Sequence, residues 1–369
     1  MCKRILFACN QVPYYGGANT TFYLLFKALQ SRDWDVHYLN LIDFQRMGFY
    51  KDVFNSDFGN PSNLLNVHNV LIKDDKVSNE LKKILDDINP DLILAKNFTA
   101  PNLLKNVNRD VNMWFFPSQS DQIRNSIYNR ILSSEEEALH IINEGKHDIP
   151  ITWIPEQEVV KHSDYILCNS KSTQSWFRYF YPEMKYKISE EILWTANLIY
   201  REHVDHFSHA QRFEDRSIDV LFIANRWDRM EKNFNMASDI MNRLNYKTNI
   251  HIVGQCDINS NGIYVHQFLH YKKVLELMKN TKTVVSTSIY DPAPNVLYEA
   301  SVLGCNVVAS KNCGNWELCN QTLLVEDYNI ESYIDKIKIS LEKRYDNNIN
   351  LFLKTDIVDQ VSQIINEKQ

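Results

Sequence analysis

Asp291, Asn295, Val296 and Glu299 are the residues of this chain whose types and spacing are best suited to chemistry. They lie in and just after a proline-rich loop that follows an apolar run, Thr283–Ser288, which predicts a buried strand. We expect a helix to begin near Asn295, a good N-cap residue, so that the unpaired N–H groups of its first turn form a site for an anion such as a diphosphate. Glu299 lies one turn further on, and its carboxylate can accept hydrogen bonds from two ribose hydroxyls held at that end.

The loop before this helix contains Pro292 and Pro294, which stiffen it and reduce the entropy lost when it closes on a ligand. The helix is expected to end at Gly304, before a further strand at Asn306–Ser310. A rigid loop before a helix with an acid near its start is also common in proteins that bind no nucleotide. This stretch alone therefore leaves both interpretations open.

A second group of charged residues follows another predicted strand, which begins at Asp219 and ends at Ala224. Arg226 and Lys232 lie in the loop after it, and Arg229 is a rival for the role of Arg226. Because ligands of parallel sheets bind beyond the carboxyl ends of the strands, these side chains can reach a pyrophosphate there, where arginine offers two parallel donors. Taken alone, the segment also fits a solvated basic loop.

Gly16 and Gly17 follow the first predicted strand, Lys3–Asn10, and precede a predicted helix, Asn19–Gln30. Two glycines let the backbone approach a ligand closely, and the helix N-terminus, with capping side chains at Asn19–Thr21, adds donors. The alternative is a simple turn.

Strand-like and helical segments alternate along most of the chain, which predicts an α/β fold with parallel sheets. The alternation is interrupted by a polar stretch without a clear period between Ile199 and Ile218. We therefore expect two Rossmann-like domains, with a cleft between them where ligands bind. The predicted division is residues 1–200, a linker at 201–217, a second domain at 218–350, and a C-terminal amphipathic helix in 351–369 that packs back toward the first domain.

Composition sets limits on the class of protein. The length of 369 residues fits two α/β domains, and 44% apolar with 23% charged residues is ordinary for a globular enzyme. A net charge of −6 argues against a nucleic-acid partner. We expect no signal peptide and no membrane-spanning helix. Seven cysteines, without a CxxC pair, suggest a reducing compartment, so the expected location is the cytoplasm.

Taken together, these motifs resemble the retaining GT-B glycosyltransferases of the family 4 type (glycosyl transferases group 1). The resemblance rests on the Tyr14–Ala18 turn, the loop with Arg226 and Lys232, the Asp291-x7-Glu299 spacing followed by Ala300, and the segment from Gly304 to Ser310. It covers nearly the whole chain, most strongly residues 219–317. It implies the GT-B fold, with the first domain on the acceptor side and the second on the nucleotide-sugar donor side.

The resemblance also implies roles for single residues. Arg226 and Lys232 would bind the donor diphosphate and stabilise it as the leaving group. Asp291 would contact the transferred sugar, where the family usually has Glu, so its shorter side chain leaves the identity of the sugar open. The donor would also meet Gly16, Gly17, Asn295 and Val296, with Glu299 on the ribose. No cofactor and no metal ion are expected.

Four other features of the sequence favour this function less. Many family members have a His after a strand of the first domain, where this chain has Pro117 and Ser118. The acidic pair in Asp33–Asp35 and the histidines of His203–His209 have metal-binding spacings. The acidic pair lies away from the carboxyl ends of predicted strands, and the histidines lie in a polar linker without cysteine partners. The aromatic and basic run Ser175–Lys187 is a candidate for peripheral contact with the inner face of the membrane, or for an acceptor surface, although Pro182 interrupts any long helix there.

The function that the sequence favours is transfer of a hexosyl or other sugar from a nucleoside-diphosphate sugar to a glycan, lipid-linked or other saccharide acceptor, as in polysaccharide biosynthesis. Two alternatives stay open. One is another reaction on the same fold, sugar-nucleotide epimerisation or phosphorolysis. The other is a catalytically silent protein that binds sugar nucleotides.

Overall fold

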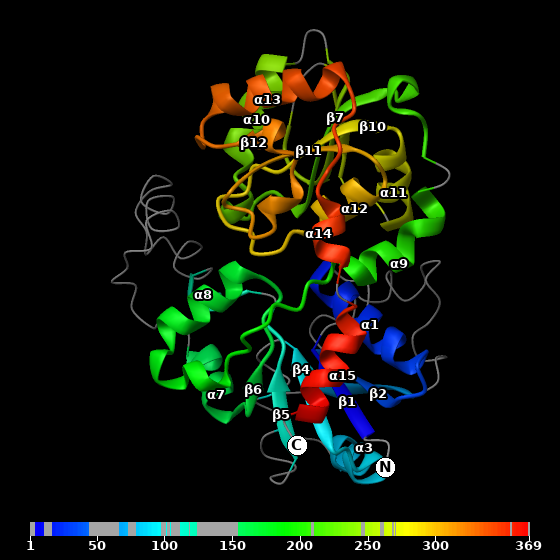
Figure 1. Ribbon diagram of the computed structural model, residues 1–369, viewed down its shortest axis with the longest axis vertical. Coiled ribbons are helices and arrows are strands. Elements are labelled where there is room, and N and C mark those ends of the chain that lie inside the picture. Colours follow the sequence, from blue (N-terminus) through cyan, green and yellow to red (C-terminus); the bar gives the residue numbers. More distant parts are fainter. Residues whose placement is uncertain are drawn as a thin grey trace. The chain divides into compact units, whose positions relative to one another are not determined.

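The computed structural model describes residues 4–10, 17–43, 66–72, 79–96, 101, 104, 111–117, 119–123, 154–207, 210–244, 248–258, 262–267, 269, 271–354 and 356–367. These residues form two compact units. The first consists of described residues up to 122, with 154–193 and 357–367, and the second of residue 123 and the described residues in 194–356. Within the described part of the chain, each unit has one six-stranded parallel sheet with helices on both faces (Figure 1).

In the first unit the strand order is β3-β2-β1-β4-β5-β6. The chain therefore leaves β1 toward one side and returns through β4 on the other, which places a topological switch point between these two strands. The elements of this unit are β1 (Arg4–Cys9), α1 (Gly17–Gln30), β2 (Asp35–Asp43), β3 (Val67–Ile72), α3 (Asn79–Ile88), β4 (Leu92–Lys96), β5 (Asn112–Phe115), α7 (Ile154–His162), β6 (Tyr165–Ile166), α8 (Lys171–Phe180), η3 (Pro182–Lys187) and α15 (Ile357–Glu367).

The first sheet is buried on both faces because neighbouring residues of its strands point in opposite directions. On one face, Leu6 of β1 and Ile93 of β4 pack in a core with Leu81 of α3. On the other, the ring of Phe7 lies 5.1 Å from that of Phe22 in α1. Two consecutive residues of β1 thus fix a different helix on each side.

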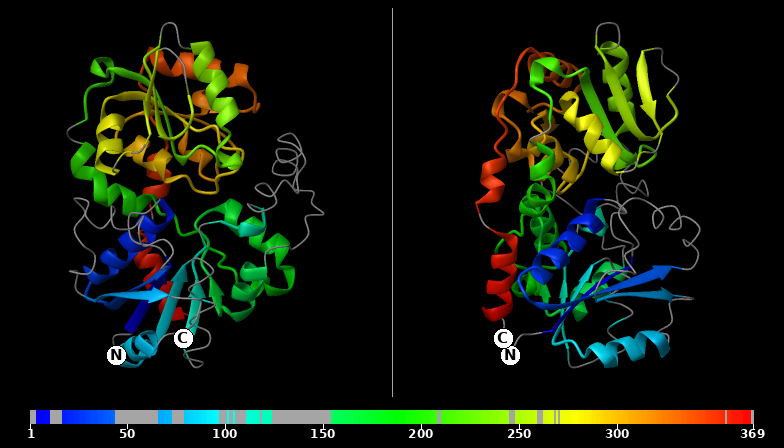
Figure 2. Two further views of the ribbon diagram at one scale, coloured as in Figure 1. Left: turned by 180° about the vertical axis from the view of Figure 1, so that it is seen from behind. Right: turned by 90° about the vertical axis from the view of Figure 1, so that its right-hand side faces the viewer.

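The second unit repeats this plan, with strand order β12-β11-β10-β7-β8-β9 and a switch point between β7 and β10. Figure 2 shows its sheet and helices from two further directions. Its elements are α9 (Ala196–Phe207), η4 (Phe213–Asp215), β7 (Ile218–Arg226), η5 (Met230–Lys232), α10 (Phe234–Leu244), β8 (Ile250–Gln255), β9 (Ile263–His266), α11 (Tyr271–Lys279), β10 (Thr281–Val285), α12 (Asn295–Val302), β11 (Asn306–Ser310), η6 (Trp316–Leu318), η7 (Gln321–Leu323), β12 (Leu324–Val325), α13 (Ile330–Glu342) and α14 (Ile349–Leu353).

Two separate apolar cores hold the second sheet between its helices. Leu221 of β7 belongs to the core that includes Leu297 of α12, together with residues of α9 and α11. The next residue, Phe222, belongs to the core that includes Ile240 of α10 and Tyr333 of α13. The alternation of buried residues along each strand therefore positions α12, which carries several of the candidate site residues.

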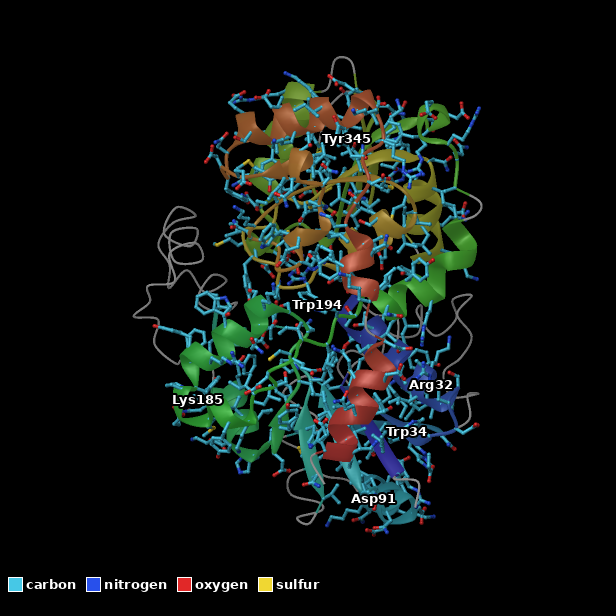
Figure 3. All side chains as sticks on the ribbon, in the orientation of Figure 1. Arg32, Trp34, Asp91, Lys185, Trp194 and Tyr345 are labelled. Carbon is cyan, nitrogen blue, oxygen red and sulfur yellow. The ribbon has the colours of Figure 1, made fainter. Side chains whose placement is uncertain are left out.

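The end of the chain contains two helices where the sequence predicted a single one over 351–367. The first, α14, packs in the second unit, where the ring of Phe352 lies 4.8 Å from that of Trp194, edge to face (Figure 3). The second, α15, contacts α1 in the first unit, and its Asp359 forms an ion pair with Arg32, which follows α1 and is labelled in Figure 3. The two helices thus belong to different units.

The predicted α/β class with two parallel sheets is confirmed. Besides the strands named above, the sequence pattern predicts strands at 35–42, 91–95, 112–116, 165–169 and 249–254, and no predicted strand matches β3, β9 or β12. All three lie at sheet edges. β9 is half-exposed and β12 is only two residues long, so neither has a strong strand pattern in the sequence. The predicted linker, 201–217, contains the end of α9 and the turn η4.

Candidate functional site

The candidate residues of the second unit lie on the loops that follow β7 and β10, with α12 after the second loop. These two strands are parallel neighbours at the switch point of the sheet. Open parallel sheets bind their ligands beyond the carboxyl ends of the strands at such a point. The fold therefore brings together, at one edge, residues that are far apart in the sequence.

Lys232 and Asp291 form an ion pair that joins the two loops. Lys232 is the last residue of η5, and its side chain is 19% exposed, against 16% for Asp291. The pair is therefore largely withdrawn from water but still open to a ligand. Two residues that the sequence placed in a catalytic role are thus in direct contact.

The loop after β11 holds the backbone of Asp291 in place. The Asp291 N–H donates to the carbonyl of Asn312 at 3.2 Å, and the Gly314 N–H donates to the carbonyl of Asp291 at 2.8 Å. A Cβ atom added to Gly314 would lie 2.0 Å from the carbonyl oxygen of Pro292, so only glycine fits there. Asn315 completes the support, since its Nδ2 donates to the carbonyl of Pro294 at 3.2 Å.

The turn that carries Lys232 is tied to the loop after β10 by further hydrogen bonds. The Thr287 hydroxyl donates to the carbonyl of Lys232 at 3.1 Å, and the Ile289 N–H donates to the carbonyl of Glu231 at 2.9 Å. Asn233, with a φ of 53°, then turns the chain into α10 in the left-handed conformation that asparagine tolerates. These contacts preorganise the backbone around the ion pair.

Of the two arginines at the end of β7 and in the loop after it, only Arg226 is mainly exposed. It is the last residue of β7, two residues beyond the predicted strand end, and its side chain is 54% exposed. Its Nε donates to Oδ1 of Asp228 at 3.0 Å, and this hydrogen bond lowers the pKa of Asp228. Arg229 donates instead to the buried carboxylate of Glu231 at 2.7 Å. Arg226 is therefore the more exposed of the two guanidinium groups, and each of them pairs with a carboxylate two residues further on.

The first turn of α12 begins at Asn295, but the predicted N-cap role of Asn295 is wrong. The N-cap residue is Pro294, which makes no side-chain capping bond, and Asn295 is the first helical residue. Proline can take this position because its fixed φ matches the −64° observed. The first turn contains no acidic residue, so the N–H groups of Asn295 and Val296, which have no acceptor within the helix, keep their positive potential. The predicted end of the helix is confirmed, with Gly304 at a φ of 73° just after the C-cap.

Glu299 is buried, and its Oε1 accepts a hydrogen bond of 2.8 Å from the hydroxyl of Tyr271 in α11. Burial raises the pKa of Glu299 to about 7, although the Tyr271 hydrogen bond acts in the opposite direction. A carboxyl group in this state accepts further hydrogen bonds readily, because each one offsets the cost of its charge. Sequence reasoning missed Tyr271, which no local pattern links to Glu299.

In the first unit, Gly17 is the first residue of α1, whereas Gly16 lies outside the described residues. The predicted capping segment, Asn19–Thr21, lies inside the helix and is buried, so the capping prediction is wrong. Pro117 is buried after β5, and Ser118 lies outside the described residues.

The acidic pair that the sequence analysis singled out takes part in an ordinary structural contact. The carboxylate of Asp35 accepts a hydrogen bond of 2.7 Å from Nε of Arg4, which lowers the pKa of Asp35. His203 and His206 lie in α9, and His209 is outside the described residues. Among the residues that the structure describes, no group of three or more His, Cys, Asp or Glu is placed to hold a metal ion.

The aromatic and basic run at 175–187 forms the end of α8 and the turn η3. Pro182 begins η3, so the predicted interruption of the helix is confirmed. Tyr179 is 40% and Tyr186 73% exposed, with Lys185 on the same turn as Tyr186 (Figure 3). No helix in the described ranges is long and apolar enough to cross a membrane.

A comparison with protein families gives one match. Residues 207–350 match the family described as glycosyl transferases group 1, a range that contains every candidate residue of the second unit. No curated protein sequence matches the chain.

Comparison with solved structures finds relatives of the whole chain. Sucrose-phosphate synthase from Thermosynechococcus elongatus is 12% identical, with 99% of each chain covered and a TM-score of 0.68. HepE from Anabaena, in complex with UDP and glucose, is 14% identical over 99% of each chain, with a TM-score of 0.64. UDP-GlcNAc 2-epimerase from Methanocaldococcus jannaschii is also 14% identical over 99% of each chain, with a TM-score of 0.54. At these identities the likeness is one of fold, and the chain has the two-domain GT-B fold.

Proposed function

We propose that this protein is a retaining glycosyltransferase that moves a sugar from a nucleoside-diphosphate sugar to a glycan, lipid-linked or other saccharide acceptor. The donor binds at the edge of the second unit formed by Lys232, Asp291, the first turn of α12 and Glu299. The observation that carries the proposal is the Lys232–Asp291 ion pair beside a helix that has no acid in its first turn. The match to glycosyl transferases group 1 over the same residues supports it.

The ion pair explains how Lys232 can act on a leaving group. Without a ligand, Asp291 neutralises Lys232 and keeps its ammonium group at the sheet edge. A diphosphate is a stronger competitor for this cation, because it carries more charge and can also use the N–H groups of Asn295 and Val296. As the bond to the sugar breaks, negative charge grows on the phosphate, and Lys232 and Arg226 stabilise it where it develops. Asp291 is then released to accept hydrogen bonds from the sugar.

Glu299 supplies the recognition of the nucleoside. Its carboxylate is buried one turn into α12, and Tyr271 fixes one of its oxygens. Two ribose hydroxyls would stabilise the ionised form, as charge-assisted hydrogen bonds do. HepE shares the fold, and its structure was solved with UDP and glucose. A uridine-diphosphate sugar is therefore the first donor to test.

The finer parts of the proposal extend the family resemblance. We place the enzyme in family 4 and in the cytoplasm, assign it no cofactor or metal ion, and connect it with polysaccharide biosynthesis. Gly16 and Gly17 serve the donor, and the first unit binds the acceptor. The exposed tyrosines and lysine of residues 179–186 are the surface that would touch a membrane if the acceptor is lipid-linked.

A panel of nucleoside-diphosphate sugars tests the proposal. One donor should raise the melting temperature of the protein, by mass action, and should release its nucleotide slowly in water. Addition of the correct acceptor should increase that release and give a product with the anomeric configuration of the donor. Loss of binding in Glu299→Ala, with the fold intact by circular dichroism, would place the donor at α12.

Other outcomes separate the alternatives. Conversion of the donor to an isomer without an acceptor would identify an epimerase, and release of a sugar phosphate with inorganic phosphate would identify a phosphorylase. Binding of one donor without turnover, across a library of glycans and lipid-linked saccharides, would identify a silent binding protein. No binding by any member of the panel would contradict the donor site itself.

A further inference from the structure

Lys96 is a buried cation at the switch point of the first sheet. It is the last residue of β4, and it pairs across the sheet with Cys9, the last residue of β1. Its relative exposure is only 1%. The lysine therefore occupies, in the first unit, the position at which the second unit carries its candidate donor site.

The ammonium group of Lys96 faces aromatic rings rather than an acid. Its Nζ lies 4.7 Å from the ring centre of Phe116 and 5.5 Å from that of Phe22. No hydrogen bond or ion pair joins Lys96 to any residue that the structure describes. Burial lowers the pKa of Lys96 to about 8, with the nearby thiol of Cys9 acting against this. Ring faces attract a cation, but they do not replace the hydration that burial removes.

Two other buried ionisable groups have partners among the residues that the structure describes. Glu156, which is fully buried, accepts hydrogen bonds from the Tyr181 and Ser120 hydroxyls and from the Asp121 N–H. Lys279, which is also buried, pairs with Glu276 at 2.7 Å. Lys96 differs from both at a place where the fold binds ligands.

We propose that Lys96 is the anchor of a second ligand site, in the first unit, that binds an oxyanion, either a phosphate or a carboxylate, on a small saccharide. The oxyanion supplies the counter-charge that the described chain does not provide, and the rings of Phe22 and Phe116 form apolar walls beside it. Identifying this ligand as the acceptor rests on the proposed function. Binding of an oxyanion at Lys96 does not rest on it, because binding requires no sugar transfer.

Three sugars that differ at carbon 6 provide the probes: glucose, glucuronate and glucose 6-phosphate. Each is titrated into the full-length protein without a donor, and binding is followed by calorimetry at pH 7. We expect at least one anionic sugar to bind ten-fold or more tightly than glucose. Tighter binding of glucuronate would identify the anion as a carboxylate, and tighter binding of glucose 6-phosphate would identify it as a phosphate. Equal binding of all three, or none, would overturn the proposal.

Two variants assign the effect to Lys96. Lys96→Met keeps the length and fills the apolar space, so it should abolish the preference for anions without lowering the melting temperature. Lys279→Met, the matched buried lysine with an internal partner, should keep the preference. A preference that survives in Lys96→Met contradicts the assignment, and so does a large loss of stability in Lys96→Met alone, which would indicate a structural lysine.

A measurement on the unmodified protein gives an independent answer. In a sample labelled with ¹³C at lysine Cε, the Lys96 signal is the one missing from Lys96→Met. Its pKa should rise from about 8 toward that of an ordinary lysine when the anionic sugar is added. An unchanged pKa at saturation would show that the anion binds elsewhere, for example at Lys232, and would exclude the Lys96 site even if the donor site is real.

Discussion

The hydroxyl of Tyr271 donates a hydrogen bond of 2.8 Å to Oε1 of Glu299 and so joins α11 to α12 below the candidate donor site. Both helices share one apolar core of the second unit. The hydrogen bond stabilises the ionised form of a carboxyl group whose pKa burial has raised to about 7. Tyr271 therefore controls both the orientation and the charge of the residue proposed to hold the ribose.

Replacing Tyr271 by Phe should weaken donor binding at pH 7 about ten-fold, because the pKa of Glu299 rises further when the hydrogen bond is lost. The loss should shrink above pH 8, where Glu299 is ionised again. Donor affinity measured by calorimetry from pH 6 to 9 tests this. Tyr181→Phe is the matched control, since that hydroxyl donates to the buried Glu156 of the first unit, and it should leave the affinity unchanged.

The central role of Lys232 can be tested against a lysine of similar exposure in the same sheet. Lys282 pairs with Asp219 at 2.8 Å, and both side chains are about as buried as Lys232 and Asp291, but they lie at the amino ends of the same two strands. Lys232→Ala should lower kcat by roughly 10²–10³-fold, with a smaller effect on donor affinity. Lys282→Ala should leave kcat unchanged. Equal losses of kcat and affinity in Lys232→Ala would instead indicate a role in binding alone.

The local sequence predicts several residues of this candidate site, but it does not predict the residues that hold them in place. A dense apolar run followed by a proline-rich loop and a helix pattern locates Asp291 and Glu299, because these signals lie within a few residues of each other. Tyr271 is 28 residues away from Glu299, and only the packing of α11 against β10 and α12 brings them together. No pattern within one segment contains such a contact.

The position of the helix start shows the limit of residue preferences. Asparagine is a better N-cap than proline in general, yet here Pro294 takes the N-cap position and Asn295 the first helical turn. The reason lies in another loop, since Asn315 donates to the Pro294 carbonyl and holds it there. The helix thus begins one residue away from the position that local residue preferences predict, at a place held by a long-range contact.

Asp291 should influence which sugar is transferred. Its backbone is held by the loop after β11 and its carboxylate pairs with Lys232, so an added methylene must change the position of the carboxylate relative to a bound sugar. Asp291→Glu should therefore change the ratio of kcat/KM between two donor sugars by about ten-fold, while the affinity for the free nucleoside diphosphate stays the same. Steady-state rates with a donor panel measure the ratio. An unchanged ratio would remove Asp291 from sugar recognition.

Gly314 should be intolerant of any side chain. A Cβ atom would lie 2.0 Å from the Pro292 carbonyl oxygen, so the proline loop must move. Gly314→Ala should destabilise the protein by about 1–3 kcal/mol and should reduce donor affinity at a temperature well below unfolding. Asn315→Ala removes a hydrogen bond to the same loop without a clash, and it should cause a smaller loss of both. Normal donor affinity in a destabilised Gly314→Ala would show that the loop does not shape the site.

Two buried carboxyl groups predict that stability falls as the pH rises from 5 to 8. Burial raises the pKa of Glu299 to about 7 and that of Glu156 to about 8, above the ordinary value of 4.5. Between 4.5 and these values the folded protein binds more protons than the unfolded chain, so the free energy of unfolding decreases with pH, by a few kcal/mol in total. Above pH 8 the buried Lys96, whose pKa is lowered to about 8, makes the free energy of unfolding increase with pH.

Urea unfolding at half-unit steps of pH measures this dependence. Glu156→Gln and Glu299→Gln should each reduce the dependence of the free energy of unfolding on pH. The two effects should add, because the two residues lie in different units. Glutamine can still accept the hydrogen bonds of the Tyr181 and Tyr271 hydroxyls, so the variants should match the unmodified protein at pH 5 and exceed its stability at pH 8. A stability that is flat or increases from pH 5 to 8 in the unmodified protein would show that these carboxyl groups titrate near their ordinary values, and the argument for charge control by Tyr271 would fail with it.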